Sequence, residues 1–245
     1  MESVTMAEKS TYVPLVSPEH AERIRRWHEN AYRAAREEGA SEQTFSYLGL
    51  TLVVPPGVQP ITGMSHLLGE AVAAEVRQGD RVLDMGTGSG VNALLAASMG
   101  AEVLAVDVNP LAVEAARRNA ERNGVSLEVR ESDVFGAVEG EFDLIVFDPP
   151  FRWFAPRDPL ESATTDEGYR AMIAFFRDVR RHLAPGGRLL IFFGTSGDLE
   201  YLLSLAREAG FGAEVVAHGD LVKDDWRVDY YTFLMRVGGA GGDLD

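Results

Sequence analysis

The chain has 245 residues, of which 46% are hydrophobic and 25% are charged, and its formal net charge is −15. This composition excludes a largely disordered, collagen-like or coiled-coil protein, and the absence of cysteine excludes disulfides and cysteine-based zinc sites. No apolar run approaches the roughly 20 residues that cross a bilayer, and residues 1–4 lack the pattern of a signal peptide. We therefore expect a cytoplasmic protein with no membrane partner, whose acidic charge disfavours nucleic acid.

The first 60 residues are expected to form an extension that precedes the main domain. Ser17 can cap a helix that Gly39 ends, and Gly49 can bend a short β hairpin. The elements predicted here are an extended arm at residues 1–17, a helix at 18–38 and a hairpin at 45–54.

From residue 61 onward, helices and strands alternate regularly. The predicted helices cover residues 65–77, 90–99, 110–123, 168–183 and 198–209, and the predicted strands cover 81–85, 102–107, 126–130, 142–147, 188–194, 213–218 and 228–237. This alternation predicts an α/β fold with a doubly wound, seven-stranded, mostly parallel sheet. The last two strands have no helix between them and should pair antiparallel. We assign residues 61–237 to this domain and the glycine-rich residues 238–245 to a flexible tail.

A glycine-rich turn follows the first strand of this domain. Asp84 is followed by Gly86, Thr87, Gly88 and Gly90, so the pattern is Asp-x-Gly-x-Gly-x-Gly between a predicted strand and a predicted helix. Glycine lets the backbone bend sharply and approach a ligand closely, and this context is the one that a cofactor-binding turn requires. A βα turn without a ligand is the alternative.

Two acidic residues follow the next two strands. Asp107 lies about 20 residues beyond the glycine-rich turn, where a carboxylate can accept hydrogen bonds from both ribose hydroxyls of a nucleoside cofactor. A role at the start of the next helix is the alternative. Val108 and Asn109 are expected in the same site. Asp133 can accept from the amino group of an adenine, with Val134 against the face of the ring.

The sequence Asp148-Pro149-Pro150-Phe151, called the tetrad below, follows the apolar strand at 142–147. The two prolines fix the backbone and remove two N–H donors, which leaves carbonyls and a carboxylate as acceptors beside an aromatic ring. Such a group can accept hydrogen bonds from an N–H₂ group and stack on a planar substrate. A rigid turn is the alternative, but the flanking carboxylate and ring favour a site.

These motifs resemble, in their order, those of the class I S-adenosylmethionine-dependent methyltransferases. The resemblance extends from Asp80 to Gly210 and implies a Rossmann-like sheet, S-adenosyl-L-methionine as cofactor and S-adenosyl-L-homocysteine as product. It also implies that Asp107 binds the ribose and Asp133 the adenine. The tetrad resembles the Asn/Asp-Pro-Pro-Tyr/Phe of enzymes that methylate planar nitrogens, especially the release-factor glutamine methyltransferases. Those enzymes usually have Asn at the first position of the tetrad. This chain has Asp148 there, and many nucleic-acid amino methyltransferases also have Asp at this position.

Three further features complete the expected site. Thr62 lies where related enzymes contact the methionine end of the cofactor, although a helix cap is an equal alternative. Residues 152–167 form a long connection, and long connections are often lids. Trp153 and Phe154 in this segment either line a substrate pocket or pack against the N-terminal helix. The histidines show no metal-ligand spacing, so they are expected at the surface or in helix caps and no metal site is predicted.

The resemblance implies methyl transfer with the acceptor nitrogen, methyl carbon and sulfur held in line. Asp148 and the carbonyl of Pro149 would accept the N–H groups of the substrate, and Phe151 would stack on it. The acidic charge and the lack of an added domain favour a small molecule as acceptor over a protein glutamine or a nucleobase. Two alternatives are a non-enzymatic adenosylmethionine-binding protein and an O- or C-methyltransferase that uses Asp148 as a base.

Overall fold

The computed structural model of the chain describes residues 12–38, 41–223 and 225–238. The strands are β1 (Gln43–Tyr47), β2 (Leu50–Val54), β3 (Arg81–Met85), β4 (Glu102–Asp107), β5 (Glu128–Glu131), β6 (Phe142–Phe147), β7 (Leu183–Gly194), β8 (Phe211–Lys223) and β9 (Trp226–Val237). The helices are α1 (Pro18–Glu38), α2 (Ser65–Glu75), α3 (Val91–Ser98), α4 (Pro110–Asn123), α5 (Pro159–Ser162), α6 (Arg170–Asp178) and α7 (Leu199–Glu208), with 3₁₀ turns at Glu167–Tyr169 and Val179–His182. In the described part of the chain, no helix is long and apolar enough to cross a membrane.

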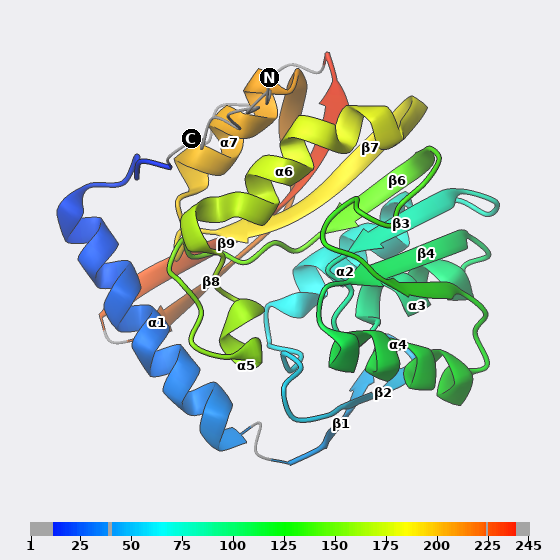
Figure 1. Cartoon of the computed structure of the whole chain (residues 1–245), viewed down its shortest axis with the longest axis horizontal. Helices are drawn as coiled ribbons and strands as arrows, with labels where there is room; N and C mark the ends of the chain where they lie inside the picture. Colours follow the sequence, from blue (N-terminus) through cyan, green and yellow to red (C-terminus); the bar gives the residue numbers. More distant parts are fainter. Residues whose placement is uncertain (1–11, 39–40, 224, 239–245) are drawn as a thin grey trace, which may run out of the picture.

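A seven-stranded sheet in the order β5-β4-β3-β6-β7-β9-β8 forms the centre of the molecule (Figure 1). The strands from β3 to β7 pair in parallel, and β9 pairs antiparallel with both β7 and β8. The predicted doubly wound α/β sheet is therefore confirmed, including its antiparallel final pair. Residues 1–11 of the expected arm and 239–245 of the expected tail lie outside the described residues.

The predicted helix and hairpin both occur in the N-terminal segment. Ser17 Oγ accepts a hydrogen bond of 3.2 Å from a backbone N–H in the first turn of α1. Strands β1 and β2 are joined through Leu48 (φ 46°) and Gly49 (φ 84°), and two positive φ values are typical of a tight two-residue hairpin turn. The hairpin packs on α4, where the side-chain amide of Asn119 bonds to both backbone polar groups of Val53 at 2.9 Å.

Several boundaries predicted from the sequence were wrong; for example, β8 covers Phe211–Lys223 instead of 213–218, and β5 covers Glu128–Glu131 instead of 126–130. The helix expected over 168–183 is α6 with a 3₁₀ turn at each end, and β7 begins at Leu183 instead of residue 188. The sequence Pro185-Gly186-Gly187 lies inside β7, at an irregularity in its pairing with β6. Gly186 adopts a φ of 77° there. Prolines and glycines of this kind fit within a strand where the ladder is interrupted by a bulge.

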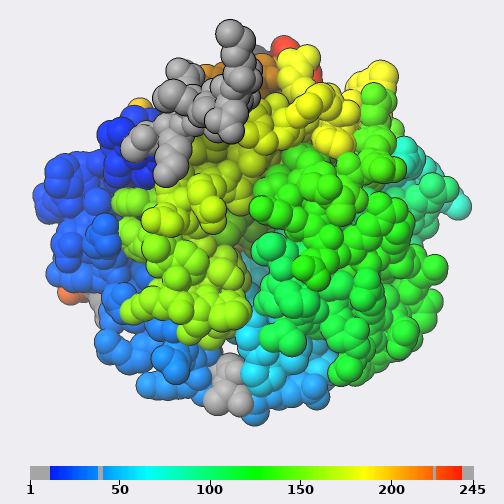
Figure 2. Space-filling model, in the orientation of Figure 1, coloured from blue at the N-terminus to red at the C-terminus, as the bar shows by residue number. Residues whose placement is uncertain are grey.

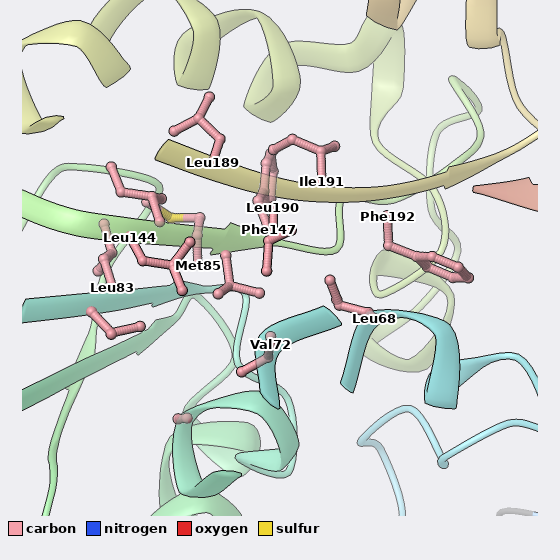
Figure 3. Close-up of a cluster of buried hydrophobic side chains, with 14 of the residues drawn as sticks. Leu68, Val72, Leu83, Met85, Leu144, Phe147, Leu189, Leu190, Ile191 and Phe192 are labelled. Carbon is pink, nitrogen blue, oxygen red and sulfur yellow. The ribbon is translucent and has the colours of Figure 1, made fainter. Parts of the chain in front are cut away.

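Helices α2, α3 and α4 cover one face of the sheet, and α6 and α7 cover the other (Figure 1). The central strands are therefore buried on both faces, and Leu83, Leu144 and Leu190 are each 0% exposed. Figure 3 shows Leu68 and Val72 of α2 directed at this part of the sheet. The core thus fixes β3 and β6, the two strands whose ends carry the residues predicted for the site.

We expect Leu144→Ala to lower the free energy of unfolding by about 2–5 kcal/mol, because it leaves a cavity between two covered faces of the sheet. Urea unfolding followed by circular dichroism measures this loss. Val222→Ala is the control, since Val222 is 65% exposed and should change stability by no more than about 0.5 kcal/mol. Equal losses for the two variants would contradict the placement of the core.

Candidate active site

The glycine-rich turn and the tetrad meet at the carboxyl ends of β3 and β6, two neighbouring strands at the centre of the sheet. These strands are parallel neighbours, and Met85 pairs with Phe147. Gly86 directly follows β3 and Asp148 directly follows β6, so the glycine-rich turn and the tetrad begin side by side. The connections leave β3 and β6 in opposite directions across the sheet, and ligands of such folds bind at this switch point.

The glycine-rich turn presents bare backbone to open space. Gly86 (φ 70°) and Gly88 (φ 55°) have backbone conformations that side chains disfavour, and a Cβ added to either would meet no atom within 4 Å. The turn is held from behind, because Gly86 N and Thr87 N both donate to Val106 O, at 2.8 and 2.9 Å. It therefore offers a rigid surface that a ligand can approach closely.

Asp84 supports this turn from below. Its side chain is buried, and Oδ2 accepts hydrogen bonds from Thr87 Oγ1 at 2.6 Å and Ala93 N at 3.1 Å. Burial raises the pKa of Asp84 to about 6, although both hydrogen bonds favour the ionised form. The hydroxyl of Thr87 is committed to Asp84, so its predicted contact with the cofactor would have to come from the backbone.

Asp107 links the glycine-rich turn to the start of α4. Its Oδ2 accepts a hydrogen bond from Gly88 N, and its Oδ1 accepts one from Asn109 N, each at 2.9 Å. Burial nevertheless raises the pKa of Asp107. Asn109, and not Asp107, caps α4 by accepting from Leu111 N at 3.0 Å. Val108 beside them is 61% exposed, so this corner of the site is open to a ligand.

The loop after β5, where the adenine is predicted to bind, contains a strained residue. Val134 has a φ of 47°, which is rare for a β-branched residue and costs about 1–3 kcal/mol. Ser132 holds it there, because its Oγ donates to Val134 O at 2.8 Å and accepts from Ala137 N at 2.9 Å. Asp133 is exposed beside it. Strain of this kind is found at ligand sites, and the adenine contact stays a prediction.

Thr62 forms a turn before α2. Its Oγ1 accepts a hydrogen bond from Met64 N and lies near Ser65 Oγ, with both distances 3.3 Å. The side chain is exposed. These contacts agree with the alternative in which Thr62 stabilises the turn, and its contact with a cofactor stays a prediction.

Asp148 is exposed to solvent at the end of β6, although the protein packed around its carboxyl group reduces the hydration of that group. Burial of its carboxyl group raises the pKa to about 7, and the nearby charge of Asp84 raises it further, while Arg152 opposes the shift. Close to neutral pH, Asp148 therefore exchanges between a proton acceptor and a neutral acid.

The rest of the tetrad is held rigidly. Pro149 is buried and Pro150 is half-buried. Phe151 is 7% exposed, and its ring packs against Phe193, with 4.7 Å between ring centroids. Its carbonyl oxygen accepts a hydrogen bond of 2.5 Å from the hydroxyl of Tyr169. Most of the Phe151 ring is therefore used in packing, and only its small exposed part remains for the predicted stacking.

Arg152 was not predicted as a site residue. This side chain is 7% exposed, directly follows the tetrad, and donates from Nη2 to Ser196 Oγ at 3.0 Å. Its position in the chain could have predicted this role, because Arg152 is a charged residue between two aromatic residues, Phe151 and Trp153, directly after the tetrad.

A groove lies between α1 and the segment that follows the tetrad. Its volume is about 510 Å³, and its lining residues are Arg25, His28, Glu29, Trp153, Phe154, Ala155, Arg157, Glu161 and Glu167. Trp153 and Phe154 thus both line a groove and pack near α1, with the Phe154 ring 5.7 Å from that of His28. Both residues are half-buried, and whether the groove receives a substrate stays a prediction.

His28 was expected at the surface or in a cap, and this was wrong. It is buried and hydrogen-bonded to Glu161 of α5 at 2.7 Å. Arg157 also donates to Glu161, through Nη2 at 2.6 Å. These contacts attach α1 to the segment that follows the tetrad.

The site fits a nucleoside cofactor with a positively charged group. Gly86 and Gly88 leave open space in front of the turn, and Asp107 and Asp148 supply carboxylate acceptors on either side of it. Figure 2 shows a hollow between the lime-coloured segments that follow the tetrad and the green segments on the other side. The ends of the two central strands lie beneath these segments.

Comparison with solved structures identifies the class of protein. The 16S rRNA N2 G1207 methyltransferase of Thermus thermophilus, solved with AdoMet and guanosine, aligns with a TM-score of 0.57 and 25% identity over 80% of this chain and 50% of that one. The ribosomal protein L11 methylase of Lactobacillus delbrueckii subsp. bulgaricus shares the fold, with a TM-score of 0.53, 21% identity and coverage of 74% and 82%. The fold is that of the class I methyltransferases, a class whose cofactor is S-adenosylmethionine.

Residues 59–208 match the family model described as methyltransferase small domain, and the chain belongs to this family. The ribosomal protein L11 methyltransferase of Thermus thermophilus is 33% identical over 180 residues, which are 72% of this chain and 63% of that protein. The ribosomal RNA small subunit methyltransferase C of Chromohalobacter salexigens is 35% identical over 170 residues, 65% of this chain and 46% of that protein. This chain thus spans less than two thirds of either relative.

The expectation of a small-molecule acceptor, with nucleic acid disfavoured, was wrong. The relatives are named for a ribosomal protein and for ribosomal RNA. The physical reason is that net charge averages over the whole surface. Arg25, Arg33, Arg36 and Arg157 line two pockets on α1 and the segment after the tetrad, together with glutamates, so a chain with a charge of −15 still has arginines gathered on part of its surface.

We expect Asp107→Ala to weaken S-adenosylmethionine and S-adenosylhomocysteine by a similar factor, roughly 10- to 100-fold, because charge-assisted hydrogen bonds to the ribose are lost. Isothermal titration calorimetry measures both affinities. Asp220→Ala, an exposed change on β8, is the control. Undiminished binding by the Asp107 variant would remove the ribose assignment.

Proposed function

We propose that this protein transfers the methyl group of S-adenosylmethionine to a planar amide nitrogen of a protein, with a ribosomal protein as the first candidate substrate. The observation that carries the proposal is the position of the tetrad, whose acceptors follow β6 directly beside the glycine-rich turn at the end of β3. Similarity to the L11 methyltransferases supports a protein substrate. A ribosomal substrate would place the enzyme in the cytoplasm.

The proposed roles are supported by the resemblance to class I methyltransferases and by the positions of these residues at the strand ends. Asp107 binds the ribose of the cofactor, Asp133 and Val134 contact its adenine, and the glycine-rich turn supports its methionine end. Asp148 and the Pro149 carbonyl accept the two N–H groups of the amide. The tetrad favours nitrogen as the acceptor atom, because it offers hydrogen-bond acceptors and its prolines have no N–H to donate.

S-adenosylmethionine supplies an electrophilic methyl group, so the electron pair of the amide nitrogen forms the new C–N bond as the methyl–sulfur bond breaks and the nitrogen proton passes to solvent. Asp148 contributes by accepting a hydrogen bond from the amide N–H, which raises electron density on the nitrogen. The rigid tetrad contributes by orientation, since Tyr169 and the aromatic packing of Phe151 keep the acceptors in place.

The groove between α1 and the segment that follows the tetrad supports a polypeptide as substrate. It contains both charge signs and two aromatic side chains, Trp153 and Phe154. Such mixed lining suits a protein segment, whereas a phosphate backbone is usually matched by a surplus of cations.

A nucleobase amino group in ribosomal RNA is the second candidate acceptor. It is favoured by 35% identity to an rRNA methyltransferase and by the structural likeness to an enzyme solved with guanosine. Adenine, guanine and cytosine each carry an amino group on a planar ring, which the tetrad could accept in the same way.

Methyl transfer to isolated bacterial ribosomes distinguishes these candidates. The enzyme is incubated with ribosomes and methyl-tritiated S-adenosylmethionine, and protein and rRNA are then separated and counted. We expect label in the protein fraction, on the side-chain nitrogen of glutamine or asparagine by mass spectrometry. Label in rRNA alone would establish the second candidate, and label in neither fraction would contradict both.

We expect Asp148→Ala to reduce single-turnover methyl transfer roughly 100-fold or more while cofactor affinity stays nearly unchanged. Asp148→Asn should keep partial activity, because its amide oxygen still accepts the substrate N–H. A true base could not be replaced in this way, since an amide cannot take a proton.

The same residue should set the pH dependence. A carboxyl group with a pKa of about 7 is protonated below that value, so wild-type turnover should rise with pH through about 7 and be lost as pH falls. Asp148→Asn should abolish this rise. A rise that persists unchanged in the Asn variant would assign it to another group.

A further inference from the structure

Arg152 is a buried cation with unused hydrogen-bond donors. Among the described residues, the hydrogen bond from Nη2 to Ser196 Oγ is the only one made by its guanidinium group. Nε is fully buried and has no partner. Burying a charged group with unmatched donors is costly, and the desolvation lowers the pKa of Arg152. The fold itself thus leaves the donor capacity of this group largely unused.

The position of Arg152 is fixed by its surroundings. Its backbone N–H donates to Thr164 O at 3.2 Å, and its carbonyl accepts from Asp166 N at 2.8 Å. Its guanidinium carbon lies 5.5 Å from the centre of the Phe151 ring. Because main chain and side chain are both held, the guanidinium keeps a constant position relative to the tetrad.

Arg152 and Asp148 also interact electrostatically. The charge of Arg152 acts to lower the pKa of Asp148, and the charge of Asp148 acts to raise that of Arg152. Tyr230, which interacts with Ser196, lies close to Arg152 as well. A fixed donor group thus lies beside the Phe151 ring of the tetrad and within electrostatic reach of Asp148.

We propose that Arg152 contacts the substrate and donates its unpartnered N–H groups to the carbonyl oxygen next to the nitrogen that receives the methyl group. This inference rests on the proposed function and adds the residue that selects the substrate. An amide carries N–H₂ and oxygen on the same carbon, so the tetrad and Arg152 together match both. A simple amine offers no oxygen and leaves the guanidinium unpaired, which is strongly unfavourable in a buried site.

The test compares Arg152→Gln, which removes the charge, with Arg152→Lys, which keeps it. The substrate is ribosomal protein extracted from bacterial ribosomes, and initial rates are measured against its concentration and against pH. We expect both variants to raise KM roughly 10- to 100-fold with a smaller change in kcat, because the oxygen is contacted before and during methyl transfer. Lysine does not restore KM, since its compact ammonium cannot reproduce the planar donor arrangement.

The pH profile separates this role from a structural one. Arg152→Gln should move the rise in turnover to higher pH, because the charge that lowers the pKa of Asp148 is gone. Arg152→Lys should keep the wild-type profile. A side chain that only filled space would move neither profile.

Two controls accompany the variants. Arg170→Gln removes an exposed charge on α6 and should leave KM and the pH profile unchanged. Calorimetry with S-adenosylhomocysteine tests whether each variant retains its fold, and an unfolded Gln variant leaves the Lys variant to decide through KM.

The outcomes distinguish the inference from the proposed function. If wild-type enzyme methylates ribosomal protein and both Arg152 variants keep its KM, the inference is overturned and the proposed function stands. If wild-type enzyme leaves ribosomal protein unlabelled, both are overturned. Raised KM in both variants, with a shifted pH profile in the Gln variant alone, supports the inference.

Discussion

The pairing register between β3 and β6 is the constraint on which the site depends. Because Met85 lies opposite Phe147, the glycine-rich turn and the tetrad leave the sheet at the same level. A shift of one residue would reverse which face each side chain points to, and would separate Asp148 from the turn. The register is set by side chains such as Leu83 and Leu144, which are 0% exposed between two layers of helices. Chemistry at the edge of this sheet is thus positioned by apolar packing at its centre.

The crowding of carboxyl groups at this edge has an energetic consequence. Asp84, Asp107 and Asp148 all have raised pKa values, mainly because each is taken out of water. Backbone N–H groups compensate Asp84 and Asp107, whereas Asp148 relies on the more distant charge of Arg152. The least compensated carboxyl is the one beside the predicted acceptor. A positively charged ligand would stabilise the ionised form of these carboxyl groups. The free protein is therefore less stable at this site than it would be with such a ligand bound.

Much of the fold could be predicted from the sequence, because hydrophobic periodicity and turn residues determine it locally. The bounds of β3, β4, α4 and β6 agree with their predicted ranges to the residue. The start of β7 could not be found this way, since Pro185-Gly186-Gly187 indicates a break and only pairing with β6 makes it a bulge. The positions of Asp84, Asp107 and Asp148 at strand ends were predictable for the same local reason. Arg152 and the burial of His28 were not, because each depends on contacts with distant parts of the chain. The acceptor class was misjudged because net charge carries no information on where the charges lie.

The contacts of the N-terminal segment join residues that are far apart in sequence. The Tyr12 hydroxyl donates to Asp198 at 2.7 Å, and His28 bonds to Glu161. A ribosome synthesises the N-terminus first, so α1 leaves the exit tunnel long before either partner exists. The sheet from β3 to β6 can form before those partners are made. During that time, the apolar side of α1, with Ile24 and Trp27, stays exposed to solvent. Docking of α1 is therefore a late event in biosynthesis, and the groove between α1 and the segment that follows the tetrad is completed only when most of the chain has been made.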